Sequence, residues 1–127
     1  MSDPTSPNTS LPTLSNEMLD DLRELVDEDT PDFLKELLET FLADAERHMG
    51  EMESGLLEAG LQTISAASHT LKSSAANLGG EQLSEWCRAI EARTRAGNAE
   101  GLEDLIGHAR EEFTRLRSEI ESLPDYR

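Results

Sequence analysis

The 127-residue sequence lacks several features that would place it in other classes of protein. It has a single cysteine, Cys87, so no disulfide can form within the chain, which fits a reducing compartment. No apolar run reaches the about 18 residues that a membrane-spanning helix needs. The first fifteen residues have neither the basic start nor the apolar stretch of a secretory signal peptide. We therefore expect a cytoplasmic protein that does not enter the membrane.

Basic residues are also scarce. The sequence has 11 Lys and Arg against 27 Asp and Glu, which gives a net charge of −16. Such a surface repels the phosphate backbone of nucleic acids, and no basic stripe offsets it. We exclude nucleic acid as a partner. The same charge weakly favours partner proteins with a basic or neutral docking face.

Aromatic residues make up only 4% of the chain, so the core must consist of Leu, Ile, Ala and Met. These apolar residues recur at helical spacing in long segments, and no useful length of sequence alternates as a strand would. Short Gly and Asn connections between the segments favour antiparallel neighbours. The sequence thus predicts an all-α fold, an up-down antiparallel four-helix bundle with a short accessory N-terminal helix. The bundle should span residues 15–123, between a disordered arm (1–14) and a short tail (124–127).

Capping residues mark the expected starts of several helices. Ser15 is a candidate N-cap of the accessory helix, and Thr30 followed by Pro31 resembles the start of the next one. Asn98 is the expected N-cap of the last helix, which we place from about residue 99 to residue 123.

The third helix expected along the chain, which ends before Gly79, carries a histidine among small residues. At about 100° per residue, its core-facing positions share one arc: Ile64, Ala67, Ser68, Leu71, Ala75 and Leu78. His69 lies roughly 155° from the centre of that arc, so it should face outward. Its outward neighbours are Lys72 and the small residues Ser65, Ala66, Ser73 and Ala76. This surface leaves room for another protein to approach His69, although a solvated histidine without a role fits the same pattern.

Lys72 and Ser73 would offer a positive charge and a hydroxyl donor to an anion attached to the histidine ring. Glu91 lies on the next helix at about the same height, because both residues are ten positions from the Gly79–Glu81 turn. Its carboxylate could accept the Nδ1–H of His69 and leave Nε2 free as a nucleophile. Spacing alone also fits a solvated helix glutamate at this position.

The stretch "HTLKSSAANLGG" resembles the signature of the histidine-containing phosphotransfer (HPt) domain. The similarity extends over about residues 31–121 and includes the "LSEWCRAIE" helix and the "RAGN" connection. The resemblance implies a four-helix bundle with an accessory helix. It also implies that His69 is phosphorylated, that Lys72 is the neighbouring cation, and that Glu91 hydrogen-bonds the ring. Ser73 replaces the usual family glycine and would tune the transfer rate, by crowding the phosphoryl group or by donating a hydrogen bond to it.

The resemblance further implies the partners and the chemistry. The phosphoryl group would come from a receiver-domain aspartate or a hybrid sensor kinase and pass to a response regulator in a bacterial-type two-component phosphorelay. Mg²⁺ would be supplied by the receiver domain, and this chain would hold no cofactor of its own. The resemblance implies neither ATP hydrolysis nor kinase activity, and the sequence has no glycine-rich nucleotide loop that would contradict this. The receiver should dock on Ser65, Ala66, Ser73 and Ala76, and a monomer is the default state.

Two other functions remain as alternatives. The chain could be a helical adaptor or inhibitor that docks a receiver or kinase domain through the same face without phosphorylation. A metal-binding bundle is the third possibility, because Asp44 with His48 and Asp104 with His108 have the i,i+4 spacing of chelating pairs. Di-metal bundles use inward Glu-x-x-His pairs, which the sequence lacks, so solvated surface pairs are the favoured interpretation.

Overall fold

The computed structural model describes residues 7–58 and 60–126, and this part of the chain contains five helices and no strand. The helices are α1 (Asn16–Arg23), α2 (Phe33–Leu57), α3 (Leu61–Leu78), α4 (Glu81–Arg95) and α5 (Leu102–Glu121). The predicted all-α class is confirmed.

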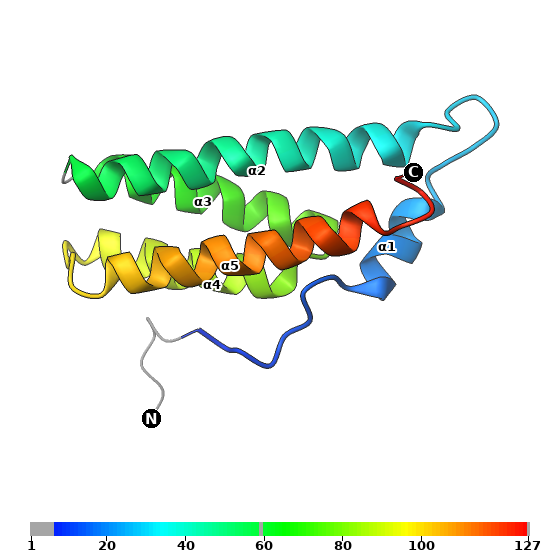
Figure 1. Cartoon of the computed structure of the whole chain (residues 1–127). Helices are drawn as coiled ribbons and strands as arrows, with labels where there is room; N and C mark the ends of the chain where they lie inside the picture. Colours follow the sequence, from blue (N-terminus) through cyan, green and yellow to red (C-terminus); the bar gives the residue numbers. More distant parts are fainter. Residues whose placement is uncertain (1–6, 59, 127) are drawn as a thin grey trace.

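Helices α2 to α5 form the bundle, and each packs against its neighbours in chain order, with α5 closing against α2. In Figure 1, α2 and α5 lie in front of α3 and α4. Helix α1 covers the end of the bundle where α2 begins, and it contacts α3. The up-down bundle with an accessory N-terminal helix is therefore as predicted.

The core is largely aliphatic, as the low aromatic content predicts, with Phe41 and Phe113 as its buried aromatic residues. Phe113, Leu71, Leu83 and Met49 are among its fully buried side chains. The buried residues of α3 are the six that the helical wheel places on its core face: Ile64, Ala67, Ser68, Leu71, Ala75 and Leu78. This burial fixes the rotation of α3, and it leaves the opposite face of the helix open to solvent.

Close packing near the α2–α3 connection depends on a glycine. A Cβ atom added at Gly55 would lie 2.5 Å from Cγ1 of Ile64, well inside van der Waals contact. The absence of a side chain at Gly55 therefore lets the end of α2 approach the first turns of α3.

The start of α1 is as predicted, whereas the start of α2 differs. Ser15 caps α1, since its Oγ accepts a hydrogen bond from the N–H of Met18 at 3.3 Å. Helix α2 begins only at Phe33, so the prediction that Thr30 is its N-cap is wrong. The carboxylate of Asp27 accepts the N–H of Thr30 at 3.1 Å, and this holds Thr30 in a turn before the helix.

The last helix also starts later than expected. Helix α5 begins at Leu102, preceded by Gly101 with a φ of 77°, a left-handed value that glycine adopts without strain. Asn98 is not its N-cap, because its side-chain oxygen instead accepts the N–H of Glu100 at 2.9 Å, within the connecting loop.

Residues 7–14 are not helical, but they differ from the expected disordered arm because they pack along α4 (Figure 1). Leu14 is buried, and the N–H of Asn8 donates to Glu85 Oε1 at 3.0 Å. The carbonyl of Pro12 accepts the N–H of Gln82 at 3.0 Å. That N–H lies in the first turn of α4, where the helix itself provides no acceptor. The rest of the predicted arm, residues 1–6, lies outside the described residues.

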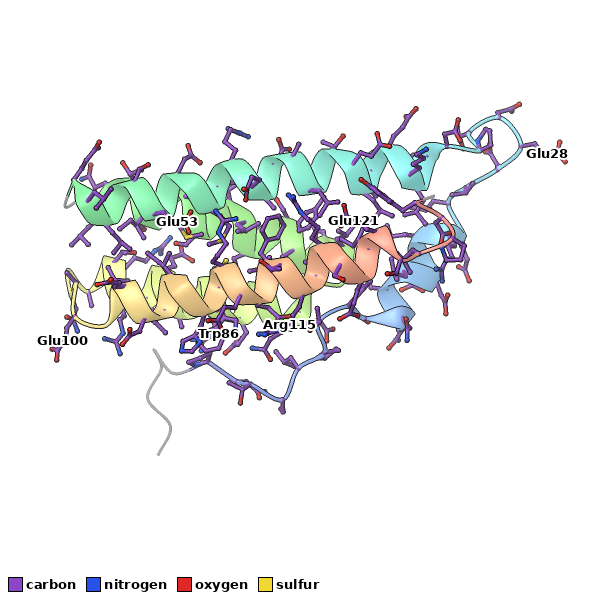
Figure 2. All side chains as sticks on the ribbon, in the orientation of Figure 1. Glu28, Glu53, Trp86, Glu100, Arg115 and Glu121 are labelled. Carbon is purple, nitrogen blue, oxygen red and sulfur yellow. The ribbon has the colours of Figure 1, made fainter. Side chains whose placement is uncertain are left out.

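Ion pairs join elements that are distant in the sequence. Arg110 of α5 binds Glu46 and Glu53 of α2, and Figure 2 shows Glu53 between these two helices. Arg23 at the end of α1 binds Asp125 at 2.7 Å. Exposed pairs of this kind contribute little stability individually. They do tie α2 to α5 and α1 to the C-terminal segment.

Candidate functional site

His69 lies in the middle of α3, on the face opposite the core. Its side chain is 55% exposed, although it also makes one strong hydrogen bond. The ring therefore combines access from solvent with a fixed orientation.

The hydrogen bond joins His69 to Glu91 of α4. Nδ1 of His69 lies 2.8 Å from Oε2 of Glu91, whose side chain is only 6% exposed. Because a carboxylate only accepts hydrogen bonds, the ring nitrogen that faces it carries the hydrogen. The neutral ring then has its lone pair on Nε2, the nitrogen that a nucleophilic imidazole uses.

Two cations surround the same carboxylate. Nζ of Lys72 donates to Oε1 of Glu91 at 2.7 Å, and Nη2 of Arg95 lies 2.8 Å from Oε2. Sequence reasoning identified Lys72 but missed Arg95. The available signal was the i,i+4 spacing from Glu91, which places Arg95 one turn further along the same face of α4. The immediate surroundings of His69 thus hold two positive charges and one negative charge.

The surrounding cations also determine the charge of Glu91. Burial alone would raise the pKa of this carboxyl, but the hydrogen bonds from Lys72 and His69 outweigh burial and lower the pKa below its ordinary value. Glu91 is therefore ionised at neutral pH. By contrast, burial raises the pKa of the nearby Cys87 thiol to about 12, so Cys87 is a neutral core residue rather than a reactive thiol.

A second contact holds α4 in register with α3. The hydroxyl of Ser84 donates to the backbone carbonyl of Lys72 at 2.9 Å. It joins the two helices about two turns from the Glu91 carboxylate. This contact supports the alignment that brings Glu91 to His69.

The residues predicted as a docking face lie around His69 on α3. Ala66, Ser73 and Ala76 are exposed, and Ser65 is half-buried. A groove of about 300 Å³ adjoins this face, between α1, α2 and the second half of α3. Its walls include Leu22, Phe41 and Asn77. The predicted docking face therefore has small side chains and borders a groove at its Ser73–Ala76 end, which suits the approach of another protein.

Three of the four residues in the two candidate chelating pairs make other contacts. Nδ1 of His48 lies 2.8 Å from Glu51, and the ring of His108 stacks on Trp86 with centroids 4.8 Å apart. Asp44 binds Arg47 at 3.4 Å. Within residues 7–58 and 60–126, no three His, Cys, Asp or Glu side chains are grouped closely enough to hold a metal ion.

The sequence profile of the Hpt domain matches residues 36–123. The chain belongs to the Hpt domain family. Two relatives show how far the similarity extends. The phosphorelay intermediate protein YPD1 of Candida albicans is 38% identical over 66 residues, which cover 52% of this chain and 36% of that protein. Histidine-containing phosphotransfer protein 4 of Arabidopsis thaliana is 25% identical over 108 residues, covering 84% of this chain and 85% of that protein.

A solved Hpt structure has the same architecture. The crystal structure of histidine-containing phosphotransfer protein B (HptB) from Pseudomonas aeruginosa PAO1 superposes with a TM-score of 0.77 at 27% sequence identity. The superposition covers 86% of this chain and 91% of that one. These relatives are named as a phosphorelay intermediate and as histidine-containing phosphotransfer proteins, and histidine phosphotransfer in a two-component phosphorelay is the function that the Hpt family supports. None of the helices in the described part of this Hpt chain is both long and apolar enough to span a membrane.

Proposed function

We propose that this Hpt protein carries a phosphoryl group on Nε2 of His69 between a receiver-domain aspartate and the aspartate of a second receiver domain. The observation that carries the proposal is the 2.8 Å hydrogen bond between Nδ1 of His69 and the buried carboxylate of Glu91. It fixes one tautomer of an exposed ring and directs the lone pair to Nε2.

The transfer step releases no proton, so it needs no separate proton acceptor. The lone pair of Nε2 attacks phosphorus while the bond from phosphorus to the aspartyl oxygen breaks and the carboxylate leaves with its electrons. The ring keeps its hydrogen on Nδ1 and becomes positively charged. Glu91 faces this charge directly and stabilises it. In the next step the P–N bond breaks, a P–O bond forms on the second receiver, and the neutral ring returns.

The cations near His69 suit the phosphoryl group that arrives. Phosphoryl transfer depends mainly on positioning and on neutralising charge on the phosphoryl oxygens. Lys72 and Arg95 provide positive charge within bonding distance of Glu91, and phosphoryl oxygens would compete with that carboxylate for them. Ser73, one turn beyond His69 on the exposed face, offers a hydroxyl to the same oxygens.

The partner supplies the remaining chemistry under this proposal. We expect Mg²⁺ to enter with the receiver domain, whose aspartate and metal perform most of the catalysis. The chain itself then acts as a carrier without autonomous kinase activity. We expect it to work as a monomer in the cytoplasm, together with a hybrid sensor kinase and a response regulator.

The proposal is tested by mixing the protein with a panel of phosphorylated receiver domains and following the label. Wild type should acquire acid-labile, base-stable label, and His69→Gln should acquire none, because an amide is not a competent nucleophile. A circular dichroism spectrum confirms that the exposed substitution leaves the fold intact. Binding of receivers without any label on the wild type would overturn the proposal in favour of a non-catalytic adaptor.

A further inference from the structure

The surface on the α2 side of His69 contains a groove that the transfer chemistry does not use. It encloses about 310 Å³ between α2 and α3. Its lining residues are His48, Glu51, Thr63, Ala66, Ala67 and Thr70. Ala66 is three residues before His69 and Thr70 is the next residue after it, so the groove opens directly beside the reacting ring.

The α2 wall of this groove is formed by His48 and Glu51, whose side chains are hydrogen-bonded to one another. Oε1 of Glu51 lies 2.8 Å from Nδ1 of His48. The His48 side chain is 12% exposed, whereas that of Glu51 is 43% exposed. The imidazole therefore forms part of the wall, and the carboxylate stands at the rim where a partner can reach it. The Thr63 and Thr70 hydroxyls add polar groups from α3.

The opposite side of His69 has the opposite charge. On the α4 side, Lys72 and Arg95 outnumber the single carboxylate of Glu91. Glu51 on the α2 side is accompanied by a histidine rather than by a lysine or arginine. A partner that docks over His69 thus meets a positive flank towards α4 and a negative flank towards α2.

We propose that the α2–α3 groove receives a lysine or arginine side chain of the receiver domain, and that Glu51 selects receivers that carry one. The inference rests on the proposed phosphotransfer function and names the charge of the partner surface. The receiver brings its acidic, phosphorylated pocket to the cationic flank, so a basic residue on its other side would pair with Glu51 and fix the docking orientation. A second copy of this chain is a poor occupant, because two chains of net charge −16 repel one another.

Another carboxylate on α2 is less suited to this role. Asp44 lies two turns before Glu51 and lines the adjoining groove with Ser74 and Asn77. Its carboxylate is already bound to Arg47 at 3.4 Å. Glu51 is therefore the residue with which charge reversal should have the larger effect.

The test uses each receiver domain that transfers its phosphoryl label to the wild-type protein. The dissociation constant of its complex with wild type, Glu51→Gln and Glu51→Lys is measured at low and at high ionic strength. Glu111→Lys is the matched control. Like Glu51, Glu111 is an exposed glutamate three positions after a histidine. Its Oε2 lies 3.9 Å from Nδ1 of His108. Glu111 lies on α5, which packs against α2 and α4. The Glu111→Lys substitution changes the net charge by the same amount as Glu51→Lys.

We expect Glu51→Lys to raise the dissociation constant about tenfold at low salt, because like charges face one another at the rim. Glu51→Gln should raise it about two- to fivefold, the range of an exposed ion pair. Both effects should shrink at high salt, and Glu111→Lys should leave binding nearly unchanged. Replacing the basic residue of the receiver by glutamate should restore binding to Glu51→Lys.

The outcomes separate this inference from the function on which it rests. Equal affinities for wild type and Glu51→Lys, or an equal loss with Glu111→Lys, would overturn the groove assignment while labelling of His69 still stood. Absence of label from every receiver would overturn the phosphotransfer function. Receiver binding that still depended on Glu51 would then show that the groove selects partners for an adaptor instead.

Discussion

His69 and Glu91 are 22 positions apart in the chain, yet their side chains meet with Nδ1 and Oε2 2.8 Å apart. The α3–α4 hairpin causes this, because both residues are nearly equidistant from its turn. One residue supplies an exposed ring and the other a buried, ionised carboxylate. The pair accounts for how an otherwise featureless helix presents a histidine in a single tautomer.

Replacing Glu91 should separate orientation of the ring from charge stabilisation. A hydrogen bond to a charged group contributes about 1.5–3 kcal/mol, so Glu91→Ala should slow transfer by about 10- to 100-fold. Glu91→Gln keeps an oxygen acceptor for Nδ1–H but loses the charge, so its loss should be smaller. Initial rates of label transfer from one phosphorylated receiver measure both. Equal rates for wild type and Glu91→Ala would contradict the role given to this carboxylate.

Ser73→Gly restores the residue that the family usually has after the lysine. We expect the transfer rate to change by about two- to tenfold, because a neutral hydrogen bond contributes about 0.5–1.5 kcal/mol. A slower variant would indicate that the hydroxyl binds the phosphoryl group, and a faster one that it crowds the group. If rates in both directions of transfer are unchanged, Ser73 has no part in the site.

Ala76→Arg should block the receiver without unfolding the protein. Ala76 is exposed on α3 within the predicted docking face, and arginine is a good helix former. We expect transfer to fall by more than about tenfold, since a bulky cation would separate the two proteins at the contact. Ser118→Arg, an exposed substitution on α5, is the control and should transfer normally. Normal transfer by Ala76→Arg, measured beside unchanged thermal unfolding, would show that the receiver docks elsewhere.

Two glycine substitutions should have opposite effects on stability. Gly55→Ala places a Cβ 2.5 Å from Cγ1 of Ile64, so it should lower the free energy of unfolding by about 1–3 kcal/mol. Gly107 in α5 has open space at the same position, so Gly107→Ala should raise the free energy of unfolding by about 0.5–1 kcal/mol. Urea titrations of both variants measure the difference. Similar midpoints would mean that α2 and α3 do not pack this closely.

The sequence predicts the features that depend on one helix or one hairpin. Helical spacing alone identifies the buried face of α3 and the outward position of His69. Counting from the Gly79–Gly80 turn is enough to bring Glu91 to the height of His69. These predictions succeed because a regular helix converts residue number directly into direction and height.

Features that depend on competing local hydrogen bonds or on packing between helices are less predictable. Thr30 has the residue type of an N-cap, but the carboxylate of Asp27 holds it in a turn instead. Residues 7–14 have little hydrophobic pattern, and their position depends on contacts with α4, in which Pro12 accepts the N–H of Gln82 and Asn8 donates to Glu85. The groove beside Glu51 exists only because α2 and α3 meet at particular rotations, which no single segment specifies.

The most direct test of the account determines which ring nitrogen carries the phosphoryl group. Protein labelled with ¹⁵N is phosphorylated by a receiver domain, and long-range ¹H–¹⁵N correlation spectra of His69 are recorded before and after transfer. The account predicts a neutral ring with hydrogen on Nδ1 before transfer, and after it phosphorus on Nε2 with the Nδ1 hydrogen retained beside Glu91. Phosphorus on Nδ1, or on a residue other than His69, would contradict it.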